Sequence, residues 1–158
     1  MPISHGTLQD ARLEAATFDL VTMSEYLEHE PEPRQVLLEA RRISKPGAYL
    51  VVEVPYMGGL PSRMFGSCWS QLDVPRHLAF YTPGTMAKML EQCGYRPVHV
   101  ATMGAPFSFG ISVLQSLGFK KLGQMRPINA FLVLAAGIPF LPFFPWLREF
   151  MLVVARAE

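Results

Sequence analysis

The sequence contains few cysteines and almost no net charge. Cys68 and Cys93 are the only two cysteines among 158 residues, and their spacing fits neither a Cys-x-x-Cys metal motif nor a disulfide framework. Fourteen basic and thirteen acidic side chains leave a formal charge of +1, so the charge balance gives no reason to expect a nucleic-acid partner. These absences favour a cytoplasmic protein and argue against a zinc ribbon or a disulfide-rich scaffold.

Hydrophobic residues make up 50% of the chain, which is enough for the core of one domain and too many for intrinsic disorder. Short apolar runs predict four strands, at residues 18–23, 48–54, 98–102 and 150–155. Between the first three runs, apolar residues at helical spacing predict helices within 36–45 and 82–94. This order of strands and helices predicts an α/β fold in which the first three strands run parallel.

Two long segments lie outside these elements. Residues 55–81 contain several glycines and prolines and no sustained period, which predicts a loop over the substrate side of the sheet. Residues 103–148 are predicted to form an apolar helical insertion before the last strand. Within it, residues 128–147 carry no charge but include three prolines, which argue against a straight membrane-spanning helix. The segment fits either a cap over an acceptor pocket or a hairpin resting on a membrane surface.

Four phrases of the sequence occur in the order and spacing of a known family. They are Phe-Asp-Leu-Val at 18–21, Glu-Tyr-Leu-Glu-His at 25–29, Arg-Ile-Ser-Lys-Pro-Gly-Ala at 42–48, and Trp-Ser-Gln-Leu-Asp-Val-Pro-Arg-His-Leu at 69–78. Together they resemble the C-terminal portion of class I S-adenosylmethionine-dependent methyltransferases of types 11, 12 and 23, and in particular the ubiquinone-biosynthesis O-methyltransferases. The resemblance implies a single truncated domain, 1–158, with a partial Rossmann-like sheet that corresponds to strands four to seven of the family.

The resemblance implies S-adenosylmethionine as the methyl donor. By position in the family, the residues beside this cofactor are Gly6, Thr7, Leu8, Ser24, Glu25 and Leu27, the first three of them near the adenine. No G-x-G-x-G turn occurs in the chain, and such a turn is what brings the backbone close to a cofactor of this kind. We therefore expect the chain alone to bind the cofactor weakly and to be weak or incompetent in methyl transfer. The alternative is a non-catalytic remnant that acts as a membrane-associated or dimerising module.

Glu25, Glu28 and His29 follow the first predicted strand, at the end where parallel sheets place their ligands. A carboxylate pair with an imidazole could deprotonate a phenol or hold a divalent cation such as magnesium. By resemblance, His29 is a catalytic candidate and all three residues are candidate metal ligands. The alternative is that the two carboxylates only cap or solvate the next segment.

The phrase at 69–78 supplies the remaining candidates. Trp69, Asp73 and Arg76 are predicted substrate residues, and His77 is a second catalytic candidate. In one interpretation the phrase is a lid, in which Trp69 stacks on the acceptor, Arg76 pairs with an anionic group and His77 removes a proton. In the other interpretation, Asp73 and Arg76 form an internal ion pair that orders the loop, and His77 caps the next helix.

We expect the methyl acceptor to be a small or lipid-like molecule, with peripheral membrane contact through residues 128–147. The first predicted strand would have a bare, apolar edge, and such an edge invites pairing with another chain. A homodimer or an exchange of strands is therefore also expected.

Overall fold

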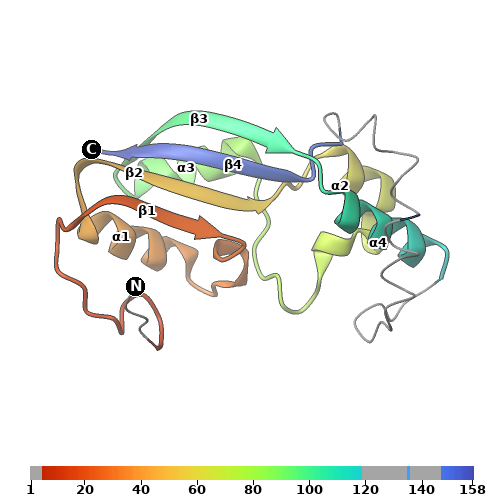
Figure 1. Ribbon diagram of the computed structural model, residues 1–158, viewed down its shortest axis with the longest axis horizontal. Helices are drawn as coiled ribbons and strands as arrows, with labels where there is room; N and C mark the ends of the chain where they lie inside the picture. Colours follow the sequence, from red (N-terminus) through yellow and green to blue (C-terminus); the bar gives the residue numbers. More distant parts are fainter. Residues whose placement is uncertain (1–4, 119–134, 136–146) are drawn as a thin grey trace.

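The computed structural model describes residues 5–118, 135 and 147–158, and its centre is a four-stranded sheet (Figure 1). The strands are β1 (Phe18–Ser24), β2 (Ser44–Pro55), β3 (Tyr95–Met103) and β4 (Phe150–Ala157). Their order across the sheet is β1-β2-β4-β3. All four predicted strands are confirmed, and each extends by one or more residues beyond the predicted run.

The strand directions confirm that the first three strands run parallel and add one reversal. β1 and β2 are parallel, whereas β4 is antiparallel to both of its neighbours, β2 and β3. The first three strands therefore run in one direction, but the sheet as a whole is mixed. β4 lies between two strands, and its Met151, Val153 and Ala155 are buried in the core. The apolar sequence of β4 indicates that this strand is buried. It does not indicate which two strands lie beside it.

Helices α1 (Pro33–Ile43) and α3 (Pro83–Gln92) share one core with the sheet. The core includes the apolar positions predicted from helical spacing together with alternate residues of β2: Val36, Leu37, Ala40, Met86, Leu90, Leu50, Val52 and Val54. On the other face of the β1–β2 pair, Leu20 and Tyr49 face each other in register and are 54% and 47% exposed. The two helices therefore leave that face of the β1–β2 pair open. No partner chain is described, so the homodimer stays a prediction.

Residues 55–81 contain more regular structure than the predicted loop. They include α2 (Leu60–Phe65) and two 3-10 turns, η2 (Gly66–Cys68) and η3 (Ser70–Leu72). A six-residue helix is too short to show a helical period in the sequence, so the prediction of one continuous loop is wrong here. A further turn, η1 (Leu27–His29), follows β1 directly.

Helix α4 (Pro106–Ser116) is part of the predicted insertion at 103–148. Apart from Ala135 and Leu147, the apolar segment 128–147 lies outside the described residues, so its interpretation as a cap or a membrane contact stays a prediction. No helix within the described ranges has both the length and the apolar composition that crossing a membrane requires.

Candidate functional site

The candidate site lies at the carboxyl ends of β1 and β2, the edge at which parallel strands usually hold ligands. Just after β1, Glu25 adopts a left-handed conformation with a φ of 50°, and its N–H donates to the carbonyl oxygen of Glu53 at 3.0 Å. This conformation costs a non-glycine residue on the order of 1 kcal/mol, and such strain clusters at functional sites. The chain then enters η1, which places Glu28 in the protein interior.

The carboxylate of Glu28 lies in the protein interior. The residue is 0% exposed, and neither of its carboxylate oxygens is hydrogen-bonded within the described part of the chain. Burial raises the pKa of Glu28, and the neighbouring His29 and His77 oppose the rise. Leaving a buried polar group unpaired costs about 1–3 kcal/mol, and more for a charge. The arrangement therefore indicates a place that a proton, a cation or a ligand completes.

Two imidazoles with the same hydrogen-bond pattern lie beside this carboxylate. His29 Nδ1 is 3.0 Å from the carbonyl oxygen of Arg76, and His77 Nδ1 is 2.6 Å from that of Gln71. Because a carbonyl oxygen only accepts, both Nδ1 atoms carry the hydrogen, and both Nε2 atoms of the neutral rings keep a free lone pair. The ring centroids are 4.7 Å apart, and one ligand atom each from Glu28 and the two imidazoles lie within 4.8 Å of one another.

Backbone hydrogen bonds hold the two parts of this group together. The carbonyl oxygen of Glu28 accepts from the N–H groups of Leu78 at 2.7 Å and Ala79 at 3.2 Å. His77 is 7% exposed and packs edge-on against the ring of Phe80. The structure thus brings together both predicted catalytic histidines, which come from distant parts of the sequence.

Glu25 and Ser24 lie at the same edge but outside this group. Burial, together with the carboxylates of Glu28 and Glu53, raises the pKa of Glu25 to about 7. Ser24 Oγ donates to Glu53 Oε2 at 2.7 Å. The group of potential metal ligands is Glu28, His29 and His77. It therefore contains His77 and not the predicted Glu25.

Arg76 and Asp73 form an ion pair with a distance of 2.5 Å, which agrees with the second interpretation of this phrase. The Arg76 side chain is largely exposed, and exposed ion pairs contribute about 0–1 kcal/mol. Thr82 rather than His77 caps α3, so the predicted capping role of His77 is wrong. Binding of an anionic acceptor by Arg76 stays a prediction.

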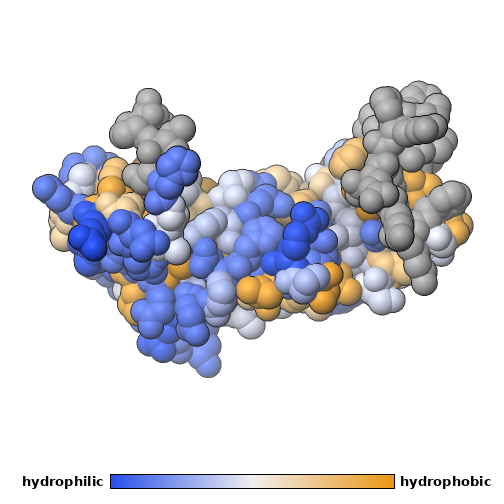
Figure 2. Space-filling view, turned by 90° about the horizontal axis from the view of Figure 1, so that it is seen from below, coloured by the Kyte–Doolittle hydropathy of each residue, from blue (hydrophilic) through white to orange (hydrophobic). Residues whose placement is uncertain are grey.

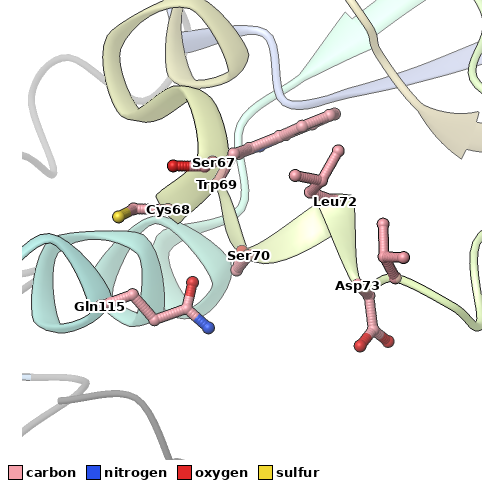
Figure 3. Close-up of a pocket in the computed structure, with 8 residues that line it drawn as sticks. Ser67, Cys68, Trp69, Ser70, Leu72, Asp73 and Gln115 are labelled. Atoms are coloured by element: carbon pink, nitrogen blue, oxygen red, sulfur yellow. The ribbon is translucent and has the colours of Figure 1, made fainter. Parts of the chain in front are cut away.

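Trp69 is buried rather than open to a ligand. It is 2% exposed, and its indole N–H donates to Glu149 Oε1 at 3.2 Å. This segment lines a cavity of about 450 Å³. In Figure 3 the Trp69 ring points away from Cys68 and Gln115. In this conformation the ring offers no open face for the predicted stacking on an acceptor.

Glu149 is absent from the residues predicted from the sequence. It is 0% exposed, and its Oε1 also accepts from the hydroxyl of Ser108 at 2.8 Å, while Oε2 has no partner among the residues described. Burial raises the pKa of Glu149 to about 7. A single acidic residue directly before an apolar strand is the one sequence signal that could have pointed to it.

Gly6, Thr7 and Leu8 lie beside the end of β1, where the predicted adenine site would be. They line a cavity of about 540 Å³ together with Met23 and Tyr26. Its walls are mainly apolar side chains, which suit a nucleobase. Leu27 is 0% exposed and belongs to the hydrophobic core, so its position gives no support to the predicted cofactor contact.

An α/β sheet with its polar site at the carboxyl ends of parallel strands is the arrangement of nucleotide- and cofactor-binding α/β proteins. A family profile described as a methyltransferase domain matches residues 3–100, so the chain belongs to this methyltransferase family.

Individual relatives agree with this assignment. The chain is 29% identical over 135 residues to a demethylmenaquinone methyltransferase of Bacillus mycoides, covering 73% of this chain and 55% of the relative. It is 50% identical over 40 residues to a ubiquinone biosynthesis O-methyltransferase of Hahella chejuensis, covering 25% and 17%. A SAM-dependent methyltransferase of Archaeoglobus fulgidus superposes with a TM-score of 0.60 at 17% identity, covering 98% of this chain and 66% of the other, which shows a shared fold. The chain spans about half the length of this demethylmenaquinone methyltransferase.

Proposed function

We propose that this chain takes part in S-adenosylmethionine-dependent methyl transfer to a small or lipid-like acceptor with an ionisable hydroxyl group. The observation that carries the proposal is the buried, unpartnered Glu28 carboxylate beside two imidazoles with free Nε2 atoms. Relatives named for demethylmenaquinone and for ubiquinone biosynthesis support an aromatic, quinone-type acceptor.

The residues at this edge have separable roles in the proposed reaction. When bound, S-adenosylmethionine supplies a methyl group on a positively charged sulfur, which the acceptor oxygen displaces in line. The Nε2 atom of His77 or His29 receives the acceptor's proton, which leaves an imidazolium ion. The Glu28 carboxylate stabilises that imidazolium in a setting with little water, where a charge pair is stronger than in solution.

The cavity beside Gly6, Thr7 and Leu8 is the proposed place of the adenosyl group. Thr22 is an exposed residue of β1 that lines this cavity, whereas Leu20 is an exposed residue of the same strand outside the lining. Replacing Thr22 with arginine should therefore obstruct the cavity without affecting the core.

We expect calorimetric titration with S-adenosylhomocysteine to give a saturable heat. Thr22→Arg should lower the affinity by at least about tenfold, whereas Leu20→Arg should leave the affinity unchanged. Equal affinities of both variants would place the cofactor elsewhere. The binding should be weak, because the chain contains no G-x-G-x-G turn. No saturable heat even at high ligand concentration, for the unsubstituted chain shown to be folded by circular dichroism, would contradict the proposed function.

A divalent cation is another occupant that the three-residue group fits. Glu28, His29 and His77 would hold it through one carboxylate oxygen and two Nε2 atoms, with the Nδ1–H groups oriented by backbone carbonyls as is usual for metal-binding imidazoles. Two nitrogen ligands favour Zn²⁺ over Mg²⁺, which prefers oxygen ligands. Such a cation would lower the pKa of a bound hydroxyl group.

We expect Zn²⁺ to raise the thermal unfolding midpoint more than Mg²⁺ does, because only Zn²⁺ matches this ligand set. At a concentration 100 times the dissociation constant, the stabilisation would be about 2.7 kcal/mol. His77→Asn should abolish the difference, and the exposed His99 gives a matched control in His99→Asn. An equal or larger effect of Mg²⁺ would contradict the ligand assignment.

A further inference from the structure

Another cavity, of about 460 Å³, opens at the same end of the sheet as the candidate site. Among the described residues its walls are Tyr56, Gly58, Gly59, Leu60, Arg63 and Arg148. Tyr56 directly follows β2, Arg63 lies on α2, and Arg148 lies two residues before β4. Figure 1 shows α2 near the start of β4, at the end of the sheet to which the β1 and β2 arrows point.

The two arginines bring positive charge to this cavity without a balancing carboxylate. Neither forms an ion pair with a described residue, whereas Arg42, Arg76 and Arg96 each have an acidic partner. No aspartate or glutamate is among the described residues that line the cavity. Glu149 is adjacent to Arg148 in sequence, but it is buried and its Oε1 accepts hydrogen bonds from Trp69 and Ser108.

A strained backbone and a close contact place the two arginines beside the same cavity. Arg148 has a φ of 48°, a left-handed conformation that is unfavourable for a residue with a side chain and that glycine adopts freely. A Cβ atom at Gly59 would overlap the carbonyl oxygen of Arg148, so glycine is needed there for the two segments to touch. The carbonyl oxygen of Gly59 in turn accepts from the N–H of Arg63 at 3.4 Å. Gly59 thus connects the helix of one arginine to the strained backbone of the other.

Apolar surface accompanies these charges. Leu60 in the cavity wall is 46% exposed, and Met57 and Met64 nearby in sequence are 39% and 55% exposed. Figure 2, seen from below, shows hydrophobic residues at the end of the molecule where α4 lies. A ligand with an apolar body and one anionic group would match both features of the surface.

We propose that Arg63 and Arg148 form an anion subsite that binds a carboxylate or phosphate group of the methyl acceptor. The planar guanidinium group donates two parallel hydrogen bonds to such oxyanions, which fixes orientation as well as charge. An anion held here would anchor the acceptor at the edge of the sheet that also carries Glu28 and the two histidines. That the anion belongs to the acceptor rests on the proposed function, whereas anion binding itself does not.

The test is a titration of the folded chain with inorganic phosphate and, separately, with acetate, at constant ionic strength. The Nε–H signals of the arginines are followed by ¹⁵N-edited NMR. We expect saturable shifts of Arg63 and Arg148 with one or both anions and none of Arg96, which pairs with Glu158 on the sheet. A response to both probes indicates an oxyanion site, and a response to one alone identifies its preferred group.

Arg148→Gly is the decisive variant because glycine suits the backbone at this position. It should keep or raise the thermal unfolding midpoint while weakening anion binding by at least about tenfold, and Arg63→Met should weaken it similarly. Absence of saturable shifts, or equal shifts of Arg96, would overturn the subsite. Binding of S-adenosylhomocysteine, measured on the same samples, separates the two proposals. If the chain bound anions but not S-adenosylhomocysteine, the proposed function would be contradicted and the anion subsite would stand.

Discussion

Replacing His77 with asparagine is expected to lower kcat for methyl transfer by about 10²–10⁴-fold, the usual contribution of a general base. The asparagine amide can still donate to the carbonyl oxygen of Gln71, as Nδ1–H of His77 does, so the loop should stay in place. What it lacks is the Nε2 lone pair of the imidazole ring. The measurement is turnover of S-adenosylmethionine with a hydroquinone acceptor.

The design includes two comparison variants. His29→Asn removes the other free Nε2 atom, and its effect relative to His77→Asn shows which imidazole receives the proton. His99→Asn changes an exposed histidine of β3 and should leave kcat unchanged. If both His29→Asn and His77→Asn turned over at the unsubstituted rate, neither histidine would be the base.

Replacing Glu149 with glutamine is expected to raise the free energy of unfolding at pH 8 by up to about 3 kcal/mol and to change it little at pH 4.5. The pKa of Glu149 is about 7 in the folded protein, against an ordinary value of 4.5. The unfolded chain therefore releases this proton at lower pH than the folded protein does. The stability linked to the proton is fully present below pH 4.5 and is lost as the pH rises through 7.

Glutamine keeps the oxygen that accepts from Trp69 and Ser108, so it removes the charge and retains these contacts. Urea unfolding at pH 4.5, 6 and 8 measures the effect, with Glu14→Gln as an exposed control. Some dependence on pH should remain in Glu149→Gln, because the pKa of Glu25 is also about 7. The account would be contradicted if the free energies of unfolding of Glu149→Gln and the unsubstituted protein differed by the same amount at every pH. The pKa of Glu149 would then be the same in the folded and the unfolded state.

The strands and the two longer helices of the core were predictable because local sequence patterns determine them. Val52 and Val54 alternate in a β-branched run, and Met86 and Leu90 recur at helical spacing after the Thr82 cap. The insertion of β4 between β2 and β3 was not predictable in this way. It depends on which strands pair, and a buried apolar strand carries no local record of its neighbours.

Most residues of the candidate site were predictable from the sequence, but which of them lie next to one another was not. His29 and Glu28 adjoin a strand end, which is a sequence signal for a ligand site. Their contact with His77 arises from hydrogen bonds of Leu78 and Ala79 to the Glu28 carbonyl, which no local pattern encodes.

For Trp69 and Glu149 the difficulty was burial. The sequence suggested an exposed, stacking Trp69, whereas the indole is buried against the carboxylate of Glu149. A contact between a loop and the start of the last strand joins residues that are far apart in the chain, so neither burial nor the shared hydrogen bond can be inferred from spacing.

The claim on which the proposed chemistry depends is that both imidazoles beside Glu28 keep a free Nε2 atom. The most direct test is ¹⁵N NMR of the histidine side chains in the folded chain, recorded with the rings in the neutral form. The account predicts that His29 and His77 both carry hydrogen on Nδ1 and none on Nε2, as their contacts with the carbonyl oxygens of Arg76 and Gln71 require. Hydrogen on Nε2 of either ring would contradict it.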